Sequence, residues 1–242
     1  MKSHILILDT AVGAGRVALT MGERALAQRA LSSPRQQAEQ IFPAAAALLE
    51  EHGLRIADLG AVAVSTGPGP FTSLRVGLTA AKSIAEVADL PLIGISSFAA
   101  VARLAPGFPA AMLLPASRGD LFLSVATMPD DANLEPARLL APLLSGVVVA
   151  RPESWLSTLA SPPRYVLSPS PEFLDLAAET LPSECRAVLV PGNWLEQLAA
   201  IARERYLAGD FDDPLQLDAA YARKDDADQS WSDPRLAPPR PQ

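Results

Sequence analysis

The chain has 242 residues, of which 49% are hydrophobic and 19% are charged, so it can bury a sizeable core and bulk disorder is excluded. Its formal net charge of −7 and pI of about 4.9 disfavour independent binding of nucleic acid, because an acidic surface repels the phosphate backbone. The single cysteine, Cys185, excludes an internal disulfide framework and fits a reducing compartment.

Apolar stretches along the chain are short. The first of them, Ile5 to Leu8, ends at Asp9 and is too short for the core of a signal peptide. The longest uncharged runs, residues 90–102 and 104–117, contain prolines and fall well short of the roughly 20 residues that cross a bilayer. We therefore expect a cytoplasmic protein that makes no contact with a membrane.

Strands and helices are predicted to alternate in the first half of the chain. Residues 4–9 have the composition of a buried strand, and a hairpin with the turn Gly22-Glu23 follows. Apolar spacing predicts a helix over residues 35–52, in which Pro43 should introduce a kink or end the first segment. The remaining predicted elements are a strand at 61–65, a helix at 72–88, a strand at 90–95 and a helix at 98–104 capped by Ser96 or Ser97.

A similar order of elements is traced a second time after a proline-rich joint at residues 106–109. The architecture repeats although the residues do not, which predicts an α/β fold of two related lobes. We expect a first lobe over residues 1–105, a smaller second lobe over 106–223 and a disordered, proline-rich tail over 224–242. The second lobe has predicted strands at 110–116, 121–127, 145–150, 164–168 and 186–191, and predicted helices at 152–160, 171–180 and 194–208.

A loop rich in glycine and proline, with the sequence STGPGPFTSLR, occupies residues 65–75 between a strand and a helix. Such a turn can hold an anion, because unpaired N–H groups and the helix dipole point outward there. However, Pro68 and Pro70 carry no N–H, and no lysine follows as in a P-loop. The pattern fits equally a rigid turn whose glycines supply positive φ and in which Thr72 or Ser73 caps the helix.

The predicted helix at 72–88 carries two apolar stripes instead of one. One stripe can face the sheet, whereas the second, beside the small Gly77, Ala80 and Ala81, requires another neighbour. The helix at 35–52 carries a similar surplus of alanines. The sequence leaves two accounts open: the two helices pack on each other, or together they form a surface for another subunit. The two stripes are Leu74, Leu78, Ala81, Ala85 and Ala88, and Val76, Ala80, Ile84 and Val87.

Three motifs, ILDTA at 7–11, STGPGPFTSLRVGL at 65–78 and PLIGISS at 91–97, resemble the TsaB (YeaZ) family at these separations. In the second half only RGDLF at 118–122 and AAYARKD at 219–225 are similar to the family's pattern. Members of this family are bacterial partners in making threonylcarbamoyladenosine at adenosine 37 of tRNA. The resemblance implies a two-lobed actin-like ATPase/sugar kinase/Hsp70 (ASKHA) fold with ribonuclease H-like lobes.

The resemblance also implies a degenerate nucleotide cleft formed by Asp9, Thr10, Gly67, Gly69 and Thr72. The family's paralogue TsaD performs the transfer with a metal held by two histidines spaced four apart on a helix. Only His4 and His52 occur here, and they cannot form that pair. Cys185 has no histidine nearby in sequence and is interpreted as a packing residue. We therefore predict no metal, no cofactor and no catalytic constellation, and Asp9 is either an acceptor of backbone N–H groups or a relic of metal-water positioning.

Two segments depart from the family's pattern. Many members have Arg-Glu-His where this chain has Arg35-Gln36-Gln37, and Asp-Ala-Arg where it has Pro115-Ala116-Ser117. The changes remove a histidine and an acidic group from the expected cleft wall. They disfavour autonomous nucleotide hydrolysis, whereas a scaffold role is unaffected because it depends on the helical surface. The sequence does not decide what Gln37 and Pro115 do instead.

The leading hypothesis is a non-catalytic subunit that binds and activates a TsaD-like transferase as a heterodimer. A TsaE-like ATPase would be the third component, the chain alone would form a homodimer, and tRNA would be contacted only through the complex. The alternative is a small-molecule kinase or ATPase of the actin-like fold, supported by Asp9 facing a glycine-rich loop. The predicted partner and dimer interface comprises Ala38, Ile41, Ala45, Arg75, Val76, Thr79, Ala80 and Ile84.

Overall fold

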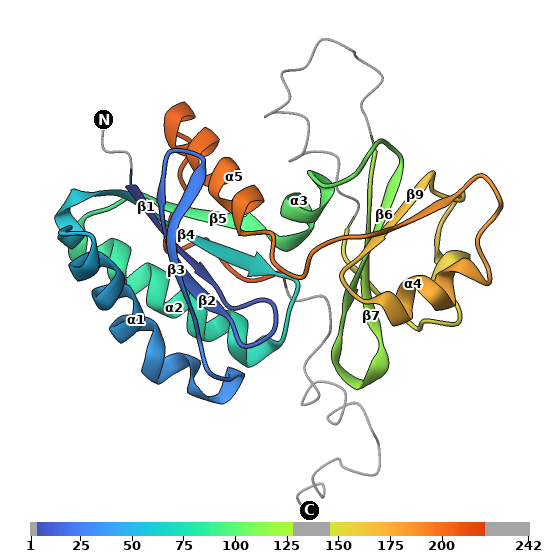
Figure 1. The fold of residues 1–242 in the computed structure, drawn as a ribbon, viewed down its shortest axis with the longest axis horizontal. Coiled ribbons are helices and arrows are strands. Elements are labelled where there is room, and N and C mark those ends of the chain that lie inside the picture. Colours follow the sequence, from blue (N-terminus) through green and yellow to red (C-terminus); the bar gives the residue numbers. More distant parts are fainter. Residues whose placement is uncertain (1–3, 128–145, 221–242) are drawn as a thin grey trace, which may run out of the picture.

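Two five-stranded mixed sheets form the framework of two lobes (Figure 1). The computed structural model describes residues 4–127 and 146–220, so the predicted tail at 224–242 lies outside the described residues. The first sheet contains β1 (His4–Asp9), β2 (Arg16–Met21), β3 (Arg24–Ala30), β4 (Leu59–Gly67) and β5 (Leu92–Ser96). The second sheet contains β6 (Ala110–Pro115), β7 (Leu121–Ala126), β8 (Val148–Ala150), β9 (Tyr165–Ser168) and β10 (Arg186–Leu189).

The two sheets repeat one topology. The strand order is β3-β2-β1-β4-β5 in the first sheet and β8-β7-β6-β9-β10 in the second. In both, the first three strands along the chain pair antiparallel and the last two add in parallel. The predicted α/β fold of two related lobes is confirmed, including the hairpin at Gly22-Glu23.

Helices cover the first sheet on both faces. The helices are α1 (Gln37–Glu51), α2 (Phe71–Ala88), α3 (Ser97–Ala102), α4 (Pro171–Ala178) and α5 (Leu195–Ala208), with short 3-10 turns that include η4 (Trp155–Thr158). Figure 1 shows α1 and α2 on one side of the first sheet, α5 on the other, and α4 against the second sheet.

Side chains alternate between the two faces along each strand, and each face of the sheet packs against its own apolar cluster. In β1, Leu6 packs into the cluster formed with α1 and α2, whereas Ile5 packs into a cluster on the opposite face. That second cluster also contains Met112 of β6, so it joins the two lobes, while Leu113 belongs to a third cluster with α4. Because both faces of each sheet are covered, the strands carry apolar residues at nearly every position.

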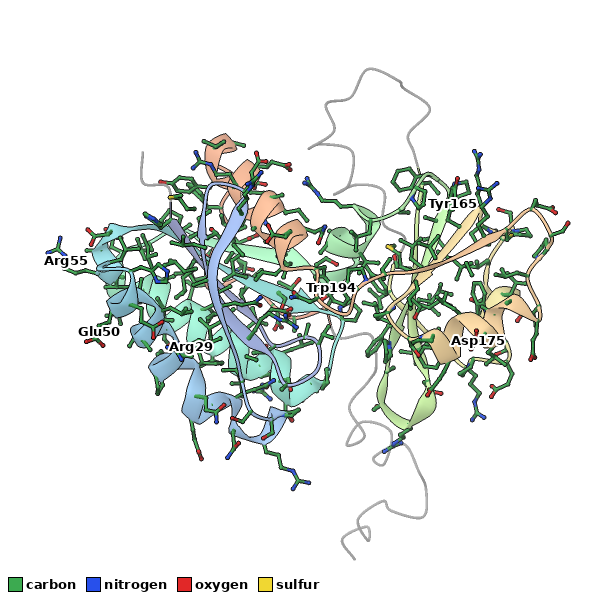
Figure 2. All side chains as sticks on the ribbon, viewed as in Figure 1. Arg29, Glu50, Arg55, Tyr165, Asp175 and Trp194 are labelled. Atoms are coloured by element: carbon green, nitrogen blue, oxygen red, sulfur yellow. The ribbon has the colours of Figure 1, made fainter. Side chains whose placement is uncertain are left out.

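The last helix, α5, returns to the first lobe although it follows the second lobe in sequence. It contacts β1, β3, β4, β5 and α3. Trp194, which precedes α5 and is 1% exposed, lies between the two lobes (Figure 2). The expected division into residues 1–105 and 106–223 stays a prediction, and α5 is the described element that packs on strands far before it in sequence.

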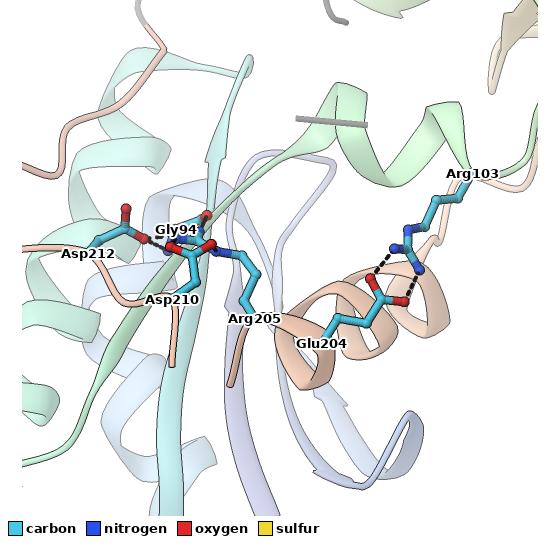
Figure 3. A network of polar contacts seen from close by, with 6 residues as sticks. All are labelled: Gly94, Arg103, Glu204, Arg205, Asp210 and Asp212. Carbon is cyan, nitrogen blue, oxygen red and sulfur yellow. Dashed lines mark hydrogen bonds and ion pairs between the residues drawn. The ribbon is translucent and has the colours of Figure 1, made fainter. Parts of the chain in front are cut away.

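A polar network attaches the end of α5 to the edge strand β5 (Figure 3). Arg205 donates from Nη1 to the carbonyl oxygen of Gly94 over 2.7 Å and forms ion pairs with Asp210 and Asp212. Asp212 in turn accepts the N–H of Gly94 over 2.6 Å. Arg103, after α3, pairs with Glu204 on α5. These contacts hold the segment after α5 against the first lobe.

Of the two effects predicted for Pro43, a helix end is excluded, because α1 continues through it and the burial of Ile41 and Leu48 on its inner face outweighs one lost hydrogen bond. Two other local predictions are wrong. Neither Thr72 nor Ser73 caps α2, since the helix begins at Phe71. The predicted helix at 152–160 is only the 3-10 turn η4, which is anchored by the buried Trp155.

Candidate functional site

The carboxylate of Asp9, at the end of β1, is buried among its own hydrogen-bond donors. The residue is 3% exposed, and its Oδ1 accepts from the hydroxyl of Ser65 over 2.7 Å and from the N–H of Ala11 over 3.2 Å. The Nε of Arg16 lies 4.0 Å from Oδ2. Burial raises the pKa of Asp9 above its usual value, against smaller lowering effects from these three partners. Asp9 therefore accepts hydrogen bonds from a local N–H and a local O–H group in this structure.

The glycine-rich loop between β4 and α2 lies directly against the turn that follows β1. A Cβ atom built on Gly69 would lie 2.5 Å from the carbonyl oxygen of Ala11, and Gly67 has a φ of +96°. Thr10 is 1% exposed, and a Cβ built on Gly77 of α2 would lie 2.2 Å from its hydroxyl oxygen. The glycines at positions 69 and 77 therefore allow the loop and α2 to approach the turn after β1 more closely than any side chain would permit.

Asp9, Thr10 and Gly69 thus lie at or directly beside this junction, and Gly67 lies at the end of β4 in the same loop. Thr72 is exposed on the first turn of α2 and lines a different feature, the groove described below. The positive φ of Gly67 is what the interpretation of the loop as a turn requires.

Metal-ligating and nucleophilic side chains are scattered through the described part of the chain. Within residues 4–127 and 146–220, no three His, Cys, Asp or Glu side chains gather where they could hold a metal ion. The Nδ1 of His52 lies 2.8 Å from the carbonyl oxygen of Leu48. Cys185 donates to the carbonyl oxygen of Pro163 over 2.7 Å, and burial raises the pKa of its thiol. None of the described helices is long and apolar enough to cross a membrane.

A groove with a volume of about 440 Å³ runs between α1 and α2. Two aromatic side chains stand at its sides, Phe42 of α1 at 50% exposure and Phe71 of α2 at 38%. The guanidinium of Arg75 lies 5.2 Å from the centre of the Phe71 ring, which fixes a positive charge beside the apolar wall. The lining residues are Ala38, Ile41, Phe42, Phe71, Thr72, Arg75, Val76, Thr79, Ala80 and Ser83.

The residues predicted as an interface fall into two groups. Ala38, Arg75 and Thr79 are exposed in the groove, and Val76 is half-buried there. Ile41 and Ala80 form its floor and are nearly covered, as are Ala45 and Ile84, which lie outside the groove in the cluster between the helices and the sheet. The first of the two accounts left open by the sequence is confirmed for the covered residues, because the helices pack together below. The space between them stays open above as a groove, and whether another subunit occupies it stays a prediction.

Sequence reasoning did not assign Phe42 and Phe71 to this site. Phe42 follows Ile41 at the edge of the apolar face of α1, where spacing alone favours a core position. Phe71 belongs to the loop motif and precedes the helix that the pattern predicted. The available signal was the combination of an aromatic residue with small neighbours on each of the two helices.

The sequence has clear counterparts among known proteins. A family model described as TsaD, tRNA N6-adenosine threonylcarbamoyltransferase, matches residues 26–131. The tRNA threonylcarbamoyladenosine biosynthesis protein TsaB of Escherichia coli (strain K12) is 36% identical over 100 residues, which are 41% of this chain and 43% of that protein. The protein of the same name from Haemophilus influenzae is 39% identical over 106 residues, 42% of each chain. The matched part spans less than half the length of these curated relatives.

Solved structures show the same architecture over nearly the whole chain. YeaZ from Pseudomonas aeruginosa superposes with a TM-score of 0.67 at 21% identity, covering 90% of this chain and 99% of that chain. The chain therefore shares its two-lobed α/β fold with YeaZ. The curated relatives named TsaB bear out the resemblance of residues in the first half of the chain to the TsaB (YeaZ) family.

Proposed function

We propose that the chain takes part in the biosynthesis of threonylcarbamoyladenosine at adenosine 37 of tRNA, as a non-catalytic subunit that binds and activates a TsaD-type transferase. The observation that carries this proposal is the open apolar groove between α1 and α2. The names of the curated relatives supply the pathway. The carboxylate of Asp9, which is buried and accepts from Ser65 and Ala11, supports a role that needs no nucleotide chemistry within this chain.

The groove has the composition of a protein-binding site. Phe42 and Phe71 present large apolar surfaces, and aromatic residues often dominate the energy of an interface. Between them, the small Ala38 and Thr79 allow the backbone of a partner helix to approach closely. Arg75 adds a positive charge beside Phe71, which favours an acidic or carbonyl-bearing group at that position of the partner.

The assembly follows from the same surface. The transferase occupies the groove in a heterodimer, and in its absence two copies of this chain pair through the same helices. A TsaE-type ATPase joins as the third protein, as the family resemblance implies. The negative net charge of the chain leaves recognition of tRNA to the complex.

A charge placed in the groove tests the proposal. Thr79→Arg introduces a long cation at an exposed groove position, so the fold should be retained while the partner must bury an unpaired charge. Affinity for a co-expressed TsaD-type transferase should fall at least about 30-fold, as for a hot-spot residue. Thr180→Arg, at an exposed position after α4, is the matched control and should bind normally. Unchanged binding by Thr79→Arg would refute this placement of the interface.

A second measurement addresses the kinase or ATPase alternative. Such an enzyme requires room for a nucleotide beside Asp9, where Gly69 and Ala11 are in contact. Calorimetric titration of the purified chain with Mg-ATP should give no binding heat. Micromolar binding, with turnover of ATP by the chain alone, would contradict a non-catalytic role.

A further inference from the structure

The turn between β1 and β2, residues 10–15, contacts both helices that form the groove. It lies at the end of β1, next to Asp9, and it does not line the groove itself. Its contact with α1 is made through Gln37 and its contact with α2 through Gly77. Each of these two residues directly precedes or follows a groove residue in sequence, Ala38 on α1 and Val76 on α2.

On the α1 side, Gln37, the first residue of the helix, is hydrogen-bonded to the β1–β2 turn. The side chain is fully buried, and its Nε2 donates to the carbonyl oxygen of Ala14 over 3.0 Å. A Cβ atom on Gly15, which has a φ of +83°, would lie 2.9 Å from that nitrogen. The oxygen of the same amide group, Oε1, is buried and has no hydrogen-bond partner in the structure. An amide with one unpaired atom is unfavourable in a core, which points to a positional role for the remaining hydrogen bond.

On the α2 side, the contact is steric. Thr10 packs against Gly77 so closely that any side chain at position 77 would overlap its hydroxyl oxygen, at 2.2 Å. The same turn also touches the start of the loop before α2, where Gly69 meets the backbone of Ala11. The turn is thus held on one side by a hydrogen bond to α1 and on the other by contact with α2.

We infer that the turn at residues 10–15 acts as a spacer between α1 and α2, so that Gln37, Thr10 and Gly77 are positioning residues for whatever the groove binds. This inference rests on the proposed function, because it assigns a way of tuning the same surface. The turn adds to the direct packing of α1 on α2 in setting the separation of the two helices, and with it the width of the groove. Changes at these residues alter affinity for the transferase without touching it.

A size-exchange experiment tests the spacer. Gly77→Ala forces Thr10 and α2 apart, and the double variant Gly77→Ala with Thr10→Ala removes the overlapping hydroxyl and methyl groups, leaving the Thr10 Cβ position at 3.2 Å. Affinity for the TsaD-type transferase should fall about tenfold in the single variant and recover to within about threefold in the double variant. Gly192→Ala is the matched control, since a Cβ there meets no atom within 4 Å.

Gln37→Met gives an independent test that does not depend on the folding of Gly77→Ala. Methionine keeps the volume and removes both the hydrogen bond and the unpaired oxygen, so the melting temperature should change little while affinity falls about threefold to tenfold. Unchanged affinity in Gln37→Met, or a folded double variant that fails to recover, would overturn the spacer role. An unaltered chain that does not bind the transferase at all would instead overturn the proposed function.

Discussion

The two lobes share one strand order, yet they differ in the helices that cover their outward faces. In the first lobe these are α1 with 15 residues and α2 with 18. In the second lobe, the corresponding places between the strands hold η4 with 4 residues and α4 with 8. Both lobes bury an apolar sheet face, but the long pair also encloses a groove. The sheets therefore have a common topology in the two lobes, and the greater length of α1 and α2 accompanies the groove that we propose as the partner site.

The largest expected effect comes from truncating one buried leucine in each lobe and comparing the losses in the free energy of unfolding. Leu78 of α2 and Leu174 of α4 are both buried, in the first and second lobe respectively. Leu78→Ala leaves a cavity enclosed by two long helices and the sheet, so it should lower the free energy of unfolding by about 3–5 kcal/mol. Leu174→Ala should cost about 2–3 kcal/mol, because the short elements around it can collapse. Urea denaturation measures both.

Equal losses in the two variants would break the comparison. That result would mean that the short elements of the second lobe confine their core as rigidly as α1 and α2 do. The presence of the groove would then not depend on how tightly the core beneath it is packed, and the lobes would differ only in the length of their helices.

Much of the fold could be predicted from the sequence, because most strands of the first sheet are short apolar runs, with the largely exposed β3 as the exception. Residues such as Leu6 and Ile5 must face opposite sides of a covered sheet, and this requirement holds whatever the partners are. The sheet on which α5 packs could not be predicted in the same way. Its pattern shows that Leu198 is buried but not against which sheet, since that depends on contacts such as Trp194 between the lobes.

The candidate site was predictable only in outline. Surplus apolar stripes identified the two helices, but the distinction between covered Ile84 and open Phe42 depends on how the helices cross. The packing of the loop on the turn after β1 depends on Gly69 meeting Ala11, which is a backbone contact between distant parts of the chain. Spacing along one segment carries no information about such a contact.

The second prediction concerns the place of α5, which follows the second lobe in sequence but packs on the first. Arg205→Ala removes the ion pairs to Asp210 and Asp212 and the bond to Gly94 (Figure 3). Hydrogen bonds to charged groups contribute about 1.5–3 kcal/mol, so the free energy of unfolding should fall by about 2 kcal/mol. The rate of amide hydrogen exchange in β5 should also rise, because Gly94 loses this contact. Urea unfolding reports only the global loss, so the exchange rates are needed to locate it.

The same network has a pH signature. Arg205 holds the pKa of Asp210 below its usual value through a hydrogen bond and its charge. A carboxyl whose pKa is lower in the folded state stabilises the protein above the unfolded pKa, and that contribution is lost as the pH falls through the folded pKa. Unfolding measured at pH 7 and pH 3 should therefore show a smaller acid loss in Arg205→Ala than in the unaltered chain. Identical acid losses would exclude Arg205 as the cause.

The smallest expected effect compares the ends of the two equivalent first strands. β1 ends at the buried carboxylate Asp9, whereas β6 ends at the exposed Pro115. Since burial raises the pKa of Asp9, its stabilising contribution is fully present below the unfolded pKa and is lost as the pH rises through the folded pKa. Asp9→Asn keeps an oxygen for Ser65 and Ala11 and removes this loss, so it should stabilise the fold at neutral pH.

Thermal melts across pH 4 to 8 separate this account from a functional one. The unaltered chain should lose stability relative to Asp9→Asn as the pH rises, and transferase binding should be equal in the two. A carboxylate that was needed by the complex would show the opposite result, with normal folding and weakened binding in Asp9→Asn. Because the substitution preserves the acceptor that holds Ala11, it leaves the turn at residues 10–15 in place and isolates the charge itself.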